Sequence, residues 1–233
     1  MMKRKLLIII PVYNEQDVIE EVLNDWINLP LNFEFKVLVI DDGSNDNSPK
    51  IINKVYKNSN KIIKIKKDNS GHGNTILFGY KYAIKNNYDL IFQTDSDNQF
   101  KSKDFKKLLD QLNTESELIL GIRKKRKDGF IRVILSKFFL RFIITILFGK
   151  FIFDPNVPYR LITNKFLKNF LDSLKKDSYF APNLLMSIYA KKTNNVVVKH
   201  YKRKTGMITW QPKKLFIFCL NLFIEIIIYR LRL

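Results

Sequence analysis

The segment FQTDSDNQF places several oxygen-bearing side chains directly after an apolar run. Asp95 and Asp97 are separated by one residue, and Gln99 follows in the same alternation. Carboxylate and amide oxygens suit a hard divalent cation, Mg²⁺ or Mn²⁺, that keeps open positions for phosphate oxygens. The same spacing is common in turns, so the segment alone leaves a turn and a metal site open.

A third interpretation of this segment is a pair of acid and base carboxylates that cleaves glycosidic bonds. It fits poorly, because side chains two positions apart at a strand end point the same way. They would not stand on opposite sides of a sugar, as a glycosidase requires.

Two further polar segments are candidates for contact with a nucleotide. In DDGSNDNS, Asp42 is placed to bond a base or ribose, and the alternative is an Asp-Gly turn with Asp46 or Ser48 as a helix cap. In NSGHGNT, residues 69–75, two glycines lead into a helical pattern and resemble an anion-binding loop. His72 within this loop is interpreted as a turn residue.

The elements that position these side chains follow from the alternation of apolar runs and helical patterns. Short runs rich in β-branched residues predict strands buried on both faces. We expect strands at 5–10, 35–40, 61–66 and 89–94 and helices at 15–29, 46–58 and 73–86. This order predicts a parallel α/β sheet. Ligands bind such sheets at the carboxyl ends of the strands, where the polar segments lie.

The composition is that of a globular protein with a strong excess of positive charge. Hydrophobic residues make up 46% of the 233 residues, and 41 Lys and Arg against 22 Asp and Glu give a net charge of +19. The charge predicts an anionic partner: nucleic acid, an anionic membrane surface or a phosphorylated substrate. The single cysteine, Cys219, excludes an internal disulfide. The apolar run near the N-terminus is too short for a signal peptide.

Two apolar segments of the second half predict helices that touch a membrane without crossing it. Segment 130–153 contains basic residues, which leave no apolar run long enough for a span. Segment 213–233 predicts an apolar helix with one polar stripe and basic flanks that suit anionic headgroups. The stripe consists of Lys214, Asn221, Glu225 and Arg232. Packing in a core or a dimer interface is the alternative for both helices.

Together the motifs resemble those of family 2 glycosyltransferases. IIIPVYNEQDVIEEVL, VLVIDDGSNDNS, GHGNTILFGYKYA and FQTDSDNQF occur in the order and at roughly the intervals of that family. The chain looks most like the polyprenyl-phosphate, dolichol-phosphate mannose synthase-like branch. The resemblance implies a glycosyltransferase A fold, a Rossmann-like and mostly parallel α/β sheet flanked by helices, with C-terminal amphipathic helices. It also favours the metal site over the turn.

The resemblance implies a division of the chain into three parts. Residues 1–125 would bind the nucleotide sugar. Residues 126–212 would form the acceptor-binding half of the same domain, including the apolar helix 130–153. Residues 213–233 would form an amphipathic helix on the membrane surface.

The resemblance also implies roles for individual residues. Those expected to contact the nucleotide sugar are Pro11, Tyr13, Glu15, Asp42, Asp95 and Ser96. Those expected to hold Mg²⁺ or Mn²⁺ are Asp95, Asp97 and Gln99. Those expected to serve catalysis and the acceptor phosphate are Asp97, Arg123, Arg132, Ser136 and Arg203. Guanidinium groups suit a phosphate. Asp154 and Arg160 resemble a further family segment, and we interpret them as a salt-bridged structural pair.

The predicted reaction moves a hexose from a nucleotide diphosphate sugar to a polyprenyl phosphate, undecaprenyl or dolichyl, with inversion at the anomeric carbon. The acceptor phosphate is ionised at neutral pH, so no strong protein base is required. Alignment and charge stabilisation would carry catalysis. The resemblance places the protein at the cytoplasmic face of the membrane, as a peripheral protein.

Three alternatives remain open. The first is a saccharide or lipid-linked glycan hydroxyl as acceptor in cell-envelope polysaccharide synthesis, which requires a general base such as Asp128 or Asp154. The second is nucleic-acid binding through the lysine-rich tracts 101–107 and 123–127, although no recognised motif accompanies them. The third is a pseudo-enzyme that only scaffolds a membrane complex. Whichever holds, the C-terminal helix is a candidate contact for a homo-oligomer or a membrane partner.

Overall fold

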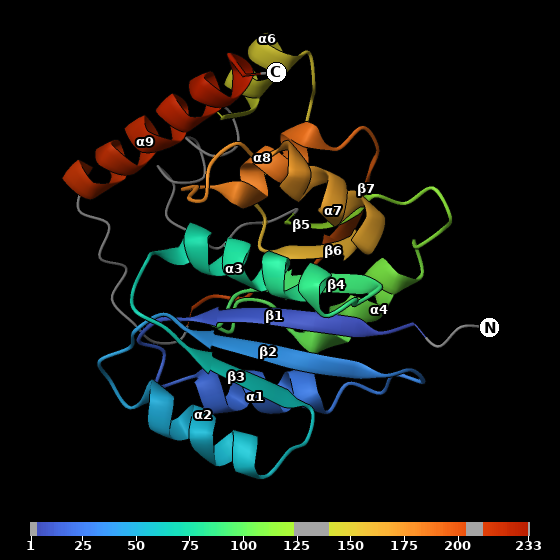
Figure 1. The fold of residues 1–233 in the computed structure, drawn as a ribbon, viewed down its shortest axis with the longest axis vertical. Coiled ribbons are helices and arrows are strands. Elements are labelled where there is room, and N and C mark those ends of the chain that lie inside the picture. Colours follow the sequence, from blue (N-terminus) through green and yellow to red (C-terminus); the bar gives the residue numbers. More distant parts are fainter. Residues whose placement is uncertain (1–3, 124–139, 204–211, 233) are drawn as a thin grey trace.

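The computed structural model describes residues 4–123, 140–203 and 212–232, and its centre is a seven-stranded sheet (Figure 1). The strands are β1 (Leu6–Val12), β2 (Phe35–Asp41), β3 (Ile62–Lys66), β4 (Leu90–Thr94), β5 (Leu118–Arg123), β6 (Tyr159–Thr163) and β7 (Thr193–Val198). Their order is β3-β2-β1-β4-β6-β5-β7. β6 runs antiparallel to both of its neighbours, and the other pairs among the described strands are parallel.

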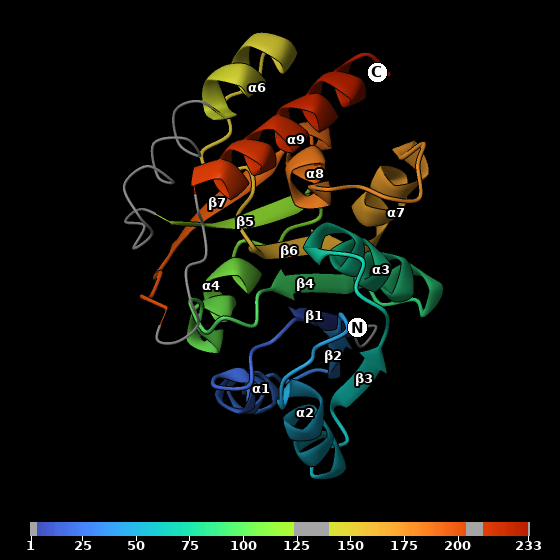
Figure 2. The same ribbon diagram turned by 90° about the vertical axis from the view of Figure 1, so that its left-hand side faces the viewer.

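Helices cover both faces of the sheet, as Figures 1 and 2 show. They are α1 (Ile19–Ile27), α2 (Ser48–Lys57), α3 (His72–Lys85), α4 (Phe105–Leu109), α6 (Leu140–Phe148), α7 (Asn164–Ser173), α8 (Pro182–Tyr189) and α9 (Pro212–Arg230). A short 3-10 turn at Ser102–Asp104 precedes α4. α1, α2 and α4 lie on one face, and α3, α7 and α8 lie on the other. α6 and α9 lie side by side next to the β5–β7 end of the sheet.

The four strands and three helices expected in the first half are confirmed, with small shifts at their ends. The largest shift is in α1, which begins at Ile19 rather than at residue 15. The Glu15 carbonyl accepts hydrogen bonds from the amides of Val18 and Ile19, which form a turn before the helix. Strands β5 to β7 were not predicted. The polar start of β7, TNNVVV, does not carry the apolar signal of a buried strand.

The apolar segment 130–153 is only partly described. Its described part forms α6, which ends at Phe148 rather than at residue 153. Gly149 follows with φ of 64°, a left-handed conformation that favours glycine and stops a helix. Residues 130–139 of the expected helix lie outside the described residues.

An aromatic cluster fills the space beneath the loop that follows β4. The Phe92 ring lies 4.7 Å from the rings of Phe105 and Tyr159 and 5.1 Å from that of Trp26, centroid to centroid. These four side chains are fully buried. The Tyr159 hydroxyl donates to the Lys101 carbonyl at 3.0 Å, so the cluster also holds the loop that carries FQTDSDNQF.

Helix α9 has an apolar stripe on each of two sides. Leu222, Ile226 and Tyr229, spaced by about one turn, are buried against the domain. A second stripe faces outward, and its four side chains are between 40% and 47% exposed. This outward stripe consists of Ile217, Leu220, Phe223 and Ile224. In the described part of the chain, none of the helices has both the length and the apolarity that crossing a bilayer requires.

Candidate active site

Hydrogen bonds join the loop after β1 to the loop after β2 at the carboxyl edge of the sheet. The amide of Asn14 donates to Ser44 Oγ at 3.0 Å, and that of Glu15 donates to Ser48 Oγ at 2.9 Å. Asn14 adopts φ of 54°, which turns the chain sharply after the strand. Pro11 is buried within β1, and Tyr13 is 47% exposed at the strand end. Both predicted nucleotide contacts thus lie beside this joined edge.

Asp42 holds a third loop in place. Its carboxylate accepts hydrogen bonds from the amides of Ser70 and Gly71, both at 3.0 Å, and forms an ion pair with Lys67. Burial acts to raise the pKa of Asp42, but the hydrogen bonds from Lys67 and Ser70 outweigh it and keep the pKa below its usual value. The residue expected to meet a base or ribose therefore also positions residues 67–71, the loop that leads into α3.

The FQTDSDNQF loop folds so that its alternating side chains reach the same edge. Asp95 and Asp97 are partly exposed, whereas Ser96 is buried. Asn98 adopts φ of 61°, and the Gln99 amide donates to Asp97 Oδ1 at 3.1 Å, which closes a tight turn. The turn and the metal site that the sequence left open are thus compatible, because the turn presents the two carboxylates.

The donor atoms present suit a divalent cation that shares its coordination with a ligand. Among the described residues, no group of three His, Cys, Asp or Glu side chains is arranged to enclose a metal ion. Mg²⁺ and Mn²⁺ sites that also bind phosphates need only one or two carboxylates, because substrate oxygens and water complete the shell. Asp95, Asp97 and the side-chain oxygen of Gln99 provide such a partial set.

Gln99 also ties this loop to the segment that carries Arg203. The Gln99 side-chain amide donates to the Tyr201 carbonyl at 3.2 Å, and the Tyr201 amide donates to the Gln99 carbonyl at 2.9 Å. Arg203 then reaches across the site and pairs with Glu15, with 2.7 Å between Nη2 and Oε1. A predicted acceptor-binding residue and a predicted donor-binding residue are therefore in direct contact.

The carboxyl group of Glu15 is in an unusual electrostatic environment. Burial raises the pKa of Glu15 to about 7, the negative charges of Asp97 and Asp95 add to the increase, and Arg203 opposes it. This effect places Glu15 within electrostatic reach of both predicted metal-binding carboxylates. A cation bound beside Asp95 and Asp97 would relieve this repulsion and favour the ionised form of Glu15.

Arg123 and Asp154 form a buried, two-pronged ion pair at the end of β5. Arg123 Nε lies 2.7 Å from Asp154 Oδ2, and Nη2 lies 2.8 Å from Oδ1. The expected pair of Asp154 with Arg160 is wrong. Arg160 is fully buried and donates to backbone carbonyls, including those of Val157 and Asn183. The antiparallel strand β6 explains the difference, because it carries Arg160 into the centre of the sheet.

Some predicted positions fall outside the described part, and some relevant residues were missed. Arg132, Ser136 and Asp128 lie outside the described residues. His72, interpreted from the sequence as a turn residue, begins α3, and its Nε2 lies 3.5 Å from Asp95 Oδ1. Gln93 was also missed. A polar residue inside the apolar strand LIFQT was the signal for a buried hydrogen-bonding partner.

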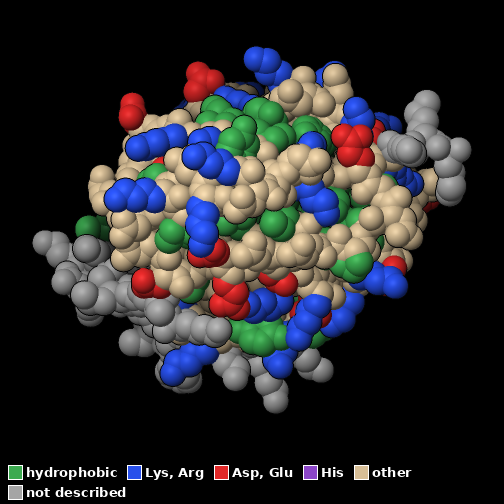
Figure 3. Space-filling model, turned by 90° about the horizontal axis from the view of Figure 1, so that it is seen from below, with side chains coloured by type: hydrophobic (Ala, Val, Ile, Leu, Met, Phe, Trp, Pro, Cys, Tyr) green, Lys and Arg blue, Asp and Glu red, His purple; other side chains and the backbone are tan. Residues whose placement is uncertain are grey.

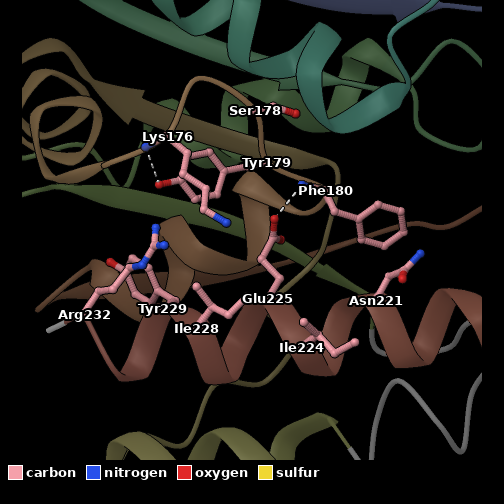
Figure 4. Close-up of a pocket in the computed structure, with 10 residues that line it drawn as sticks. All are labelled: Lys176, Ser178, Tyr179, Phe180, Asn221, Ile224, Glu225, Ile228, Tyr229 and Arg232. Carbon is pink, nitrogen blue, oxygen red and sulfur yellow. Dashed lines mark hydrogen bonds between the residues drawn. The ribbon is translucent and has the colours of Figure 1, made fainter.

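A separate depression lies between α9 and residues 176–180, as Figure 4 shows. Its volume is about 300 Å³, and it has apolar walls with cationic groups at one end. Glu225 from α9 accepts hydrogen bonds from the amides of Phe180 and Ala181, at 2.6 and 2.7 Å. The lining includes Lys176, Phe180, Ile224, Ile228 and Arg232. The polar stripe expected on α9 therefore faces this depression at Asn221, Glu225 and Arg232.

Residues 7–174 match the sequence profile described as Glycosyl transferase family 2. An uncharacterized protein of Methanocaldococcus jannaschii is 32% identical over 205 residues, which cover 84% of this chain and 86% of that protein. The undecaprenyl-phosphate 4-deoxy-4-formamido-L-arabinose transferase of Klebsiella pneumoniae is 27% identical over 207 residues. That match covers 87% of this chain but 62% of the transferase, so this chain spans less than two thirds of that enzyme.

Solved structures with a similar fold include glucosyl-3-phosphoglycerate synthase of Mycobacterium tuberculosis. In its complex with Mn²⁺, uridine diphosphate and glucosyl-3-phosphoglycerate, the TM-score to this chain is 0.69 at 14% sequence identity. The superposition covers 97% of this chain and 80% of the synthase. At this identity the likeness concerns the fold.

Proposed function

This chain belongs to glycosyl transferase family 2 and has the glycosyltransferase A fold, and we propose that it transfers a hexose from a nucleotide diphosphate sugar to a polyprenyl phosphate. The observation that carries the proposal is the convergence of Glu15, Asp42, the Asp95–Gln99 loop and Arg203 at one edge of the sheet. Carboxylates for a cation and an arginine for an anion thus lie together. The polyprenyl-phosphate relative from Klebsiella pneumoniae supports this class of acceptor.

The donor half of the proposed site is the edge formed by β1, β2 and β4. Tyr13 and Asp42 would flank the nucleoside, and the diphosphate would lie near Ser96 and a cation held by Asp95, Asp97 and Gln99. When bound, such a cation neutralises charge on the departing diphosphate and aligns it. The solved synthase complex contains Mn²⁺ and uridine diphosphate, which supports a divalent cation of this type.

The acceptor half would contribute positive charge opposite the carboxylates. An oxygen of the acceptor phosphate would attack the anomeric carbon as the bond to the diphosphate breaks, so the product is inverted at that carbon. The phosphate is already ionised, and no proton needs to be removed. Arg203, at 30% side-chain exposure, is placed to meet it beside Glu15. Arg123, which is paired with Asp154, would contribute a second guanidinium to the acceptor side. The contributions of Arg132 and Ser136 remain predictions.

The ion pair with Arg123 bears on the choice of acceptor. A hydroxyl acceptor requires a general base, and Asp154 was one of two candidates for it. Both Asp154 oxygens accept hydrogen bonds from the Arg123 guanidinium, which stabilises the carboxylate and weakens it as a base. This arrangement favours a phosphate over a hydroxyl acceptor.

We also propose that α6 and α9 bring the protein to an anionic membrane surface, at its cytoplasmic face. The outward stripe of α9 is matched on the neighbouring α6 by Phe142 and Ile146, each 64% exposed. Arg230 and Arg232 at the end of α9 are exposed. Apolar side chains together with adjacent cations favour an interface with anionic lipids.

The face that Figure 3 shows gives the nucleic-acid alternative little support. Figure 3 shows Lys and Arg side chains spread over the face seen from below, mixed with acidic and apolar side chains rather than gathered into one continuous strip. Weak binding that salt abolishes is the behaviour expected from such a surface.

The decisive test combines a binding assay with a transfer assay. Nucleotide sugars with either base, added with Mn²⁺ or Mg²⁺, should raise the melting temperature, because ligands that bind the folded state stabilise it by about 2.7 kcal/mol at a concentration of 100 Kd. Radiolabelled sugar should then pass to polyprenyl phosphate rather than to a glycan acceptor.

Asp97→Ala should abolish both the metal-dependent stabilisation and the transfer. Asp177→Ala is the matched control, because this carboxylate is fully exposed and is not one of the predicted metal ligands. It should leave the metal-dependent stabilisation and the transfer unchanged. Full activity of Asp97→Ala with unchanged metal dependence would contradict the metal site. Transfer to a glycan hydroxyl alone would contradict the acceptor assignment.

A further inference from the structure

Gln93 is a fully buried amide in β4, two positions before Asp95 on the same strand end. Its neighbours in LIFQT are buried and mostly apolar, so the amide has no access to water. A buried amide is costly unless its donors and acceptors are paired. The hydrogen bonds that Gln93 makes therefore reveal why a polar residue stands at this position.

The bonds form a chain that runs through three elements and ends at Asp95. The Tyr80 hydroxyl of α3 donates to Asn183 Oδ1 at 2.7 Å. Asn183 Nδ2, in the first turn of α8, donates to Gln93 Oε1 at 2.9 Å. Gln93 Nε2 then donates to Asp95 Oδ1 at 3.2 Å. Each group donates in the same direction, toward a carboxylate that only accepts when ionised.

Asn183, a middle member of this chain, is itself fixed by a buried cation. Arg160 Nη1 donates to the Asn183 carbonyl at 2.7 Å, and the same guanidinium donates to the Val157 carbonyl. The Ser187 hydroxyl lies within hydrogen-bond distance of two carbonyl oxygens, that of Pro155 at 2.7 Å and that of Asn183 at 3.0 Å. Asn183, Arg160 and Ser187 are at most 3% exposed. The start of α8 is thus locked, and Asn183 has little freedom to release Gln93.

We propose that Gln93 and Asn183 are positioning residues that orient the Asp95 carboxylate, with Oδ1 held by Gln93 and Oδ2 left to a divalent cation that would also bind the donor diphosphate. The inference rests on the proposed metal-dependent function. His72 also lies near Asp95 Oδ1, at 3.5 Å, but it is 59% exposed and is not held by a buried network. Partners that orient metal ligands typically change metal affinity 10- to 100-fold when they are removed, an effect expected here at about that size.

A positioning role and a purely structural role predict different results for two variants. Gln93→Met keeps the side-chain volume but leaves Asn183 Nδ2 buried without a partner, which should lower the melting temperature. The triple variant Gln93→Met, Asn183→Leu, Tyr80→Phe replaces each polar side chain that forms the hydrogen-bonded chain leading to Asp95 with an apolar one. Replacing both partners of a buried hydrogen bond by apolar groups can restore stability. It cannot restore the hydrogen bond to Asp95.

The experiment measures Mn²⁺ binding to the full chain by calorimetry in the presence of uridine or guanosine diphosphate, together with the melting temperature. Both variants should bind Mn²⁺ about 10- to 100-fold more weakly than the wild type, while the triple variant regains melting temperature relative to Gln93→Met. Ser187→Ala is the matched control in α8. It removes the contacts of the Ser187 hydroxyl with the Pro155 and Asn183 carbonyls but leaves the hydrogen bonds that run from Tyr80 to Asp95 in place, so its Mn²⁺ affinity should equal that of the wild type.

Three outcomes would overturn the inference. If Mn²⁺ affinity recovers with stability in the triple variant, the network has only a structural role. If the wild type binds Mn²⁺ through Asp97 and Gln93→Met binds it equally well, the positioning role fails while the proposed function stands. If the wild type shows no Mn²⁺-dependent nucleotide binding, the metal assignment and this inference fail together.

Discussion

Glu15 illustrates how the surroundings of one residue set its chemistry at this site. Its carboxyl is 12% exposed, paired with Arg203, and repelled by Asp95 and Asp97. The pair with Arg203 joins positions 188 residues apart in the chain. An acceptor phosphate that approaches Arg203 would compete with Glu15 for the same guanidinium. The contact between Glu15 and Arg203 therefore links the proposed donor and acceptor halves.

The pH dependence of stability should report the raised pKa of Glu15. With a folded-state pKa of about 7 against 4.5 as its ordinary value, the folded protein holds this proton more tightly than the unfolded chain. The stabilising contribution is complete below about pH 4.5 and is lost as pH rises through about 7. Between pH 5 and pH 8, without metal, the melting temperature of the wild type should fall by at least ~3 °C more than that of Glu15→Gln.

Glu20→Gln is the control for this measurement, since Glu20 pairs with Lys54 on the exposed side of α1. Its melting temperature should follow that of the wild type across the same range. Parallel curves for the wild type and Glu15→Gln would show that Glu15 does not titrate in this window.

Asp42→Asn should weaken nucleotide binding and lower stability together. The neutral amide cannot balance the Lys67 charge or accept both backbone hydrogen bonds in the present geometry. We expect the Kd for a nucleotide sugar to rise about tenfold or more, since loss of a charged hydrogen-bonding partner costs about 1.5–3 kcal/mol. Titration of the two proteins with nucleotide sugar measures it. Asp68→Asn, at an exposed neighbour, should leave the Kd unchanged.

At the scale of elements, residues 178–181 connect three helices. Asn74, in the first turn of α3, accepts hydrogen bonds from Ser178 and from the amide of Tyr179. Glu225 of α9 holds the next two amides at the start of α8. A carboxylate at a helix N-terminus is stabilised by the helix dipole. One short segment therefore ties the start of α3, the start of α8 and the middle of α9 together.

Gly73→Ala should disturb this junction. An added Cβ would lie 2.2 Å from the Phe180 carbonyl oxygen and 2.6 Å from that of Tyr179, and backbone atoms cannot move aside as a flexible side chain does. Overpacking of this kind costs about 1–3 kcal/mol, which should lower the melting temperature by several degrees. Lys85→Ala, at an exposed position of the same helix, should change it by about 1 °C or less. Equal melting temperatures for Gly73→Ala and the wild type would contradict this packing.

At the scale of the whole molecule, charge and apolar exposure are distributed differently. Lys and Arg side chains are spread over the face shown in Figure 3, whereas exposed apolar side chains gather on α6 and α9. The donor edge is acidic within a chain of net charge +19. This distribution is the one that the proposed attachment to an anionic surface, with phosphate handling at the carboxylate-rich edge, would require.

Vesicle binding should depend on the outward stripe of α9. Leu220→Ser with Phe223→Ser removes two exposed apolar side chains, each worth about 1.5–3 kcal/mol when fully buried. Sedimentation with vesicles that contain anionic phospholipid should show at least a tenfold weaker partition than for the wild type. Tyr56→Ser, at a 42% exposed aromatic of α2, is the control and should bind like the wild type. Unchanged binding of the double variant would exclude α9 as the contact.

Local patterns in the sequence determined much of the donor half. Apolar runs of strand length, Gly71 before α3 and the spacing of Asp95, Asp97 and Gln99 depend on residues close together in the chain. Such patterns indicate secondary structure and turns because they reflect local backbone geometry and periodic burial. The strands β1 to β4, their helices and the loop of carboxylates could accordingly be predicted.

The pairing of distant elements was decided only by the tertiary structure. Nothing in YRLIT indicates that β6 inserts antiparallel between β4 and β5, and that insertion directs Arg160 toward Asn183 and leaves Asp154 to Arg123. The contacts of Gln93 and of Arg203 arise in the same way. Which buried polar groups meet depends on strand order and on the packing of whole elements, and the hydrophobic pattern of a single segment does not encode either.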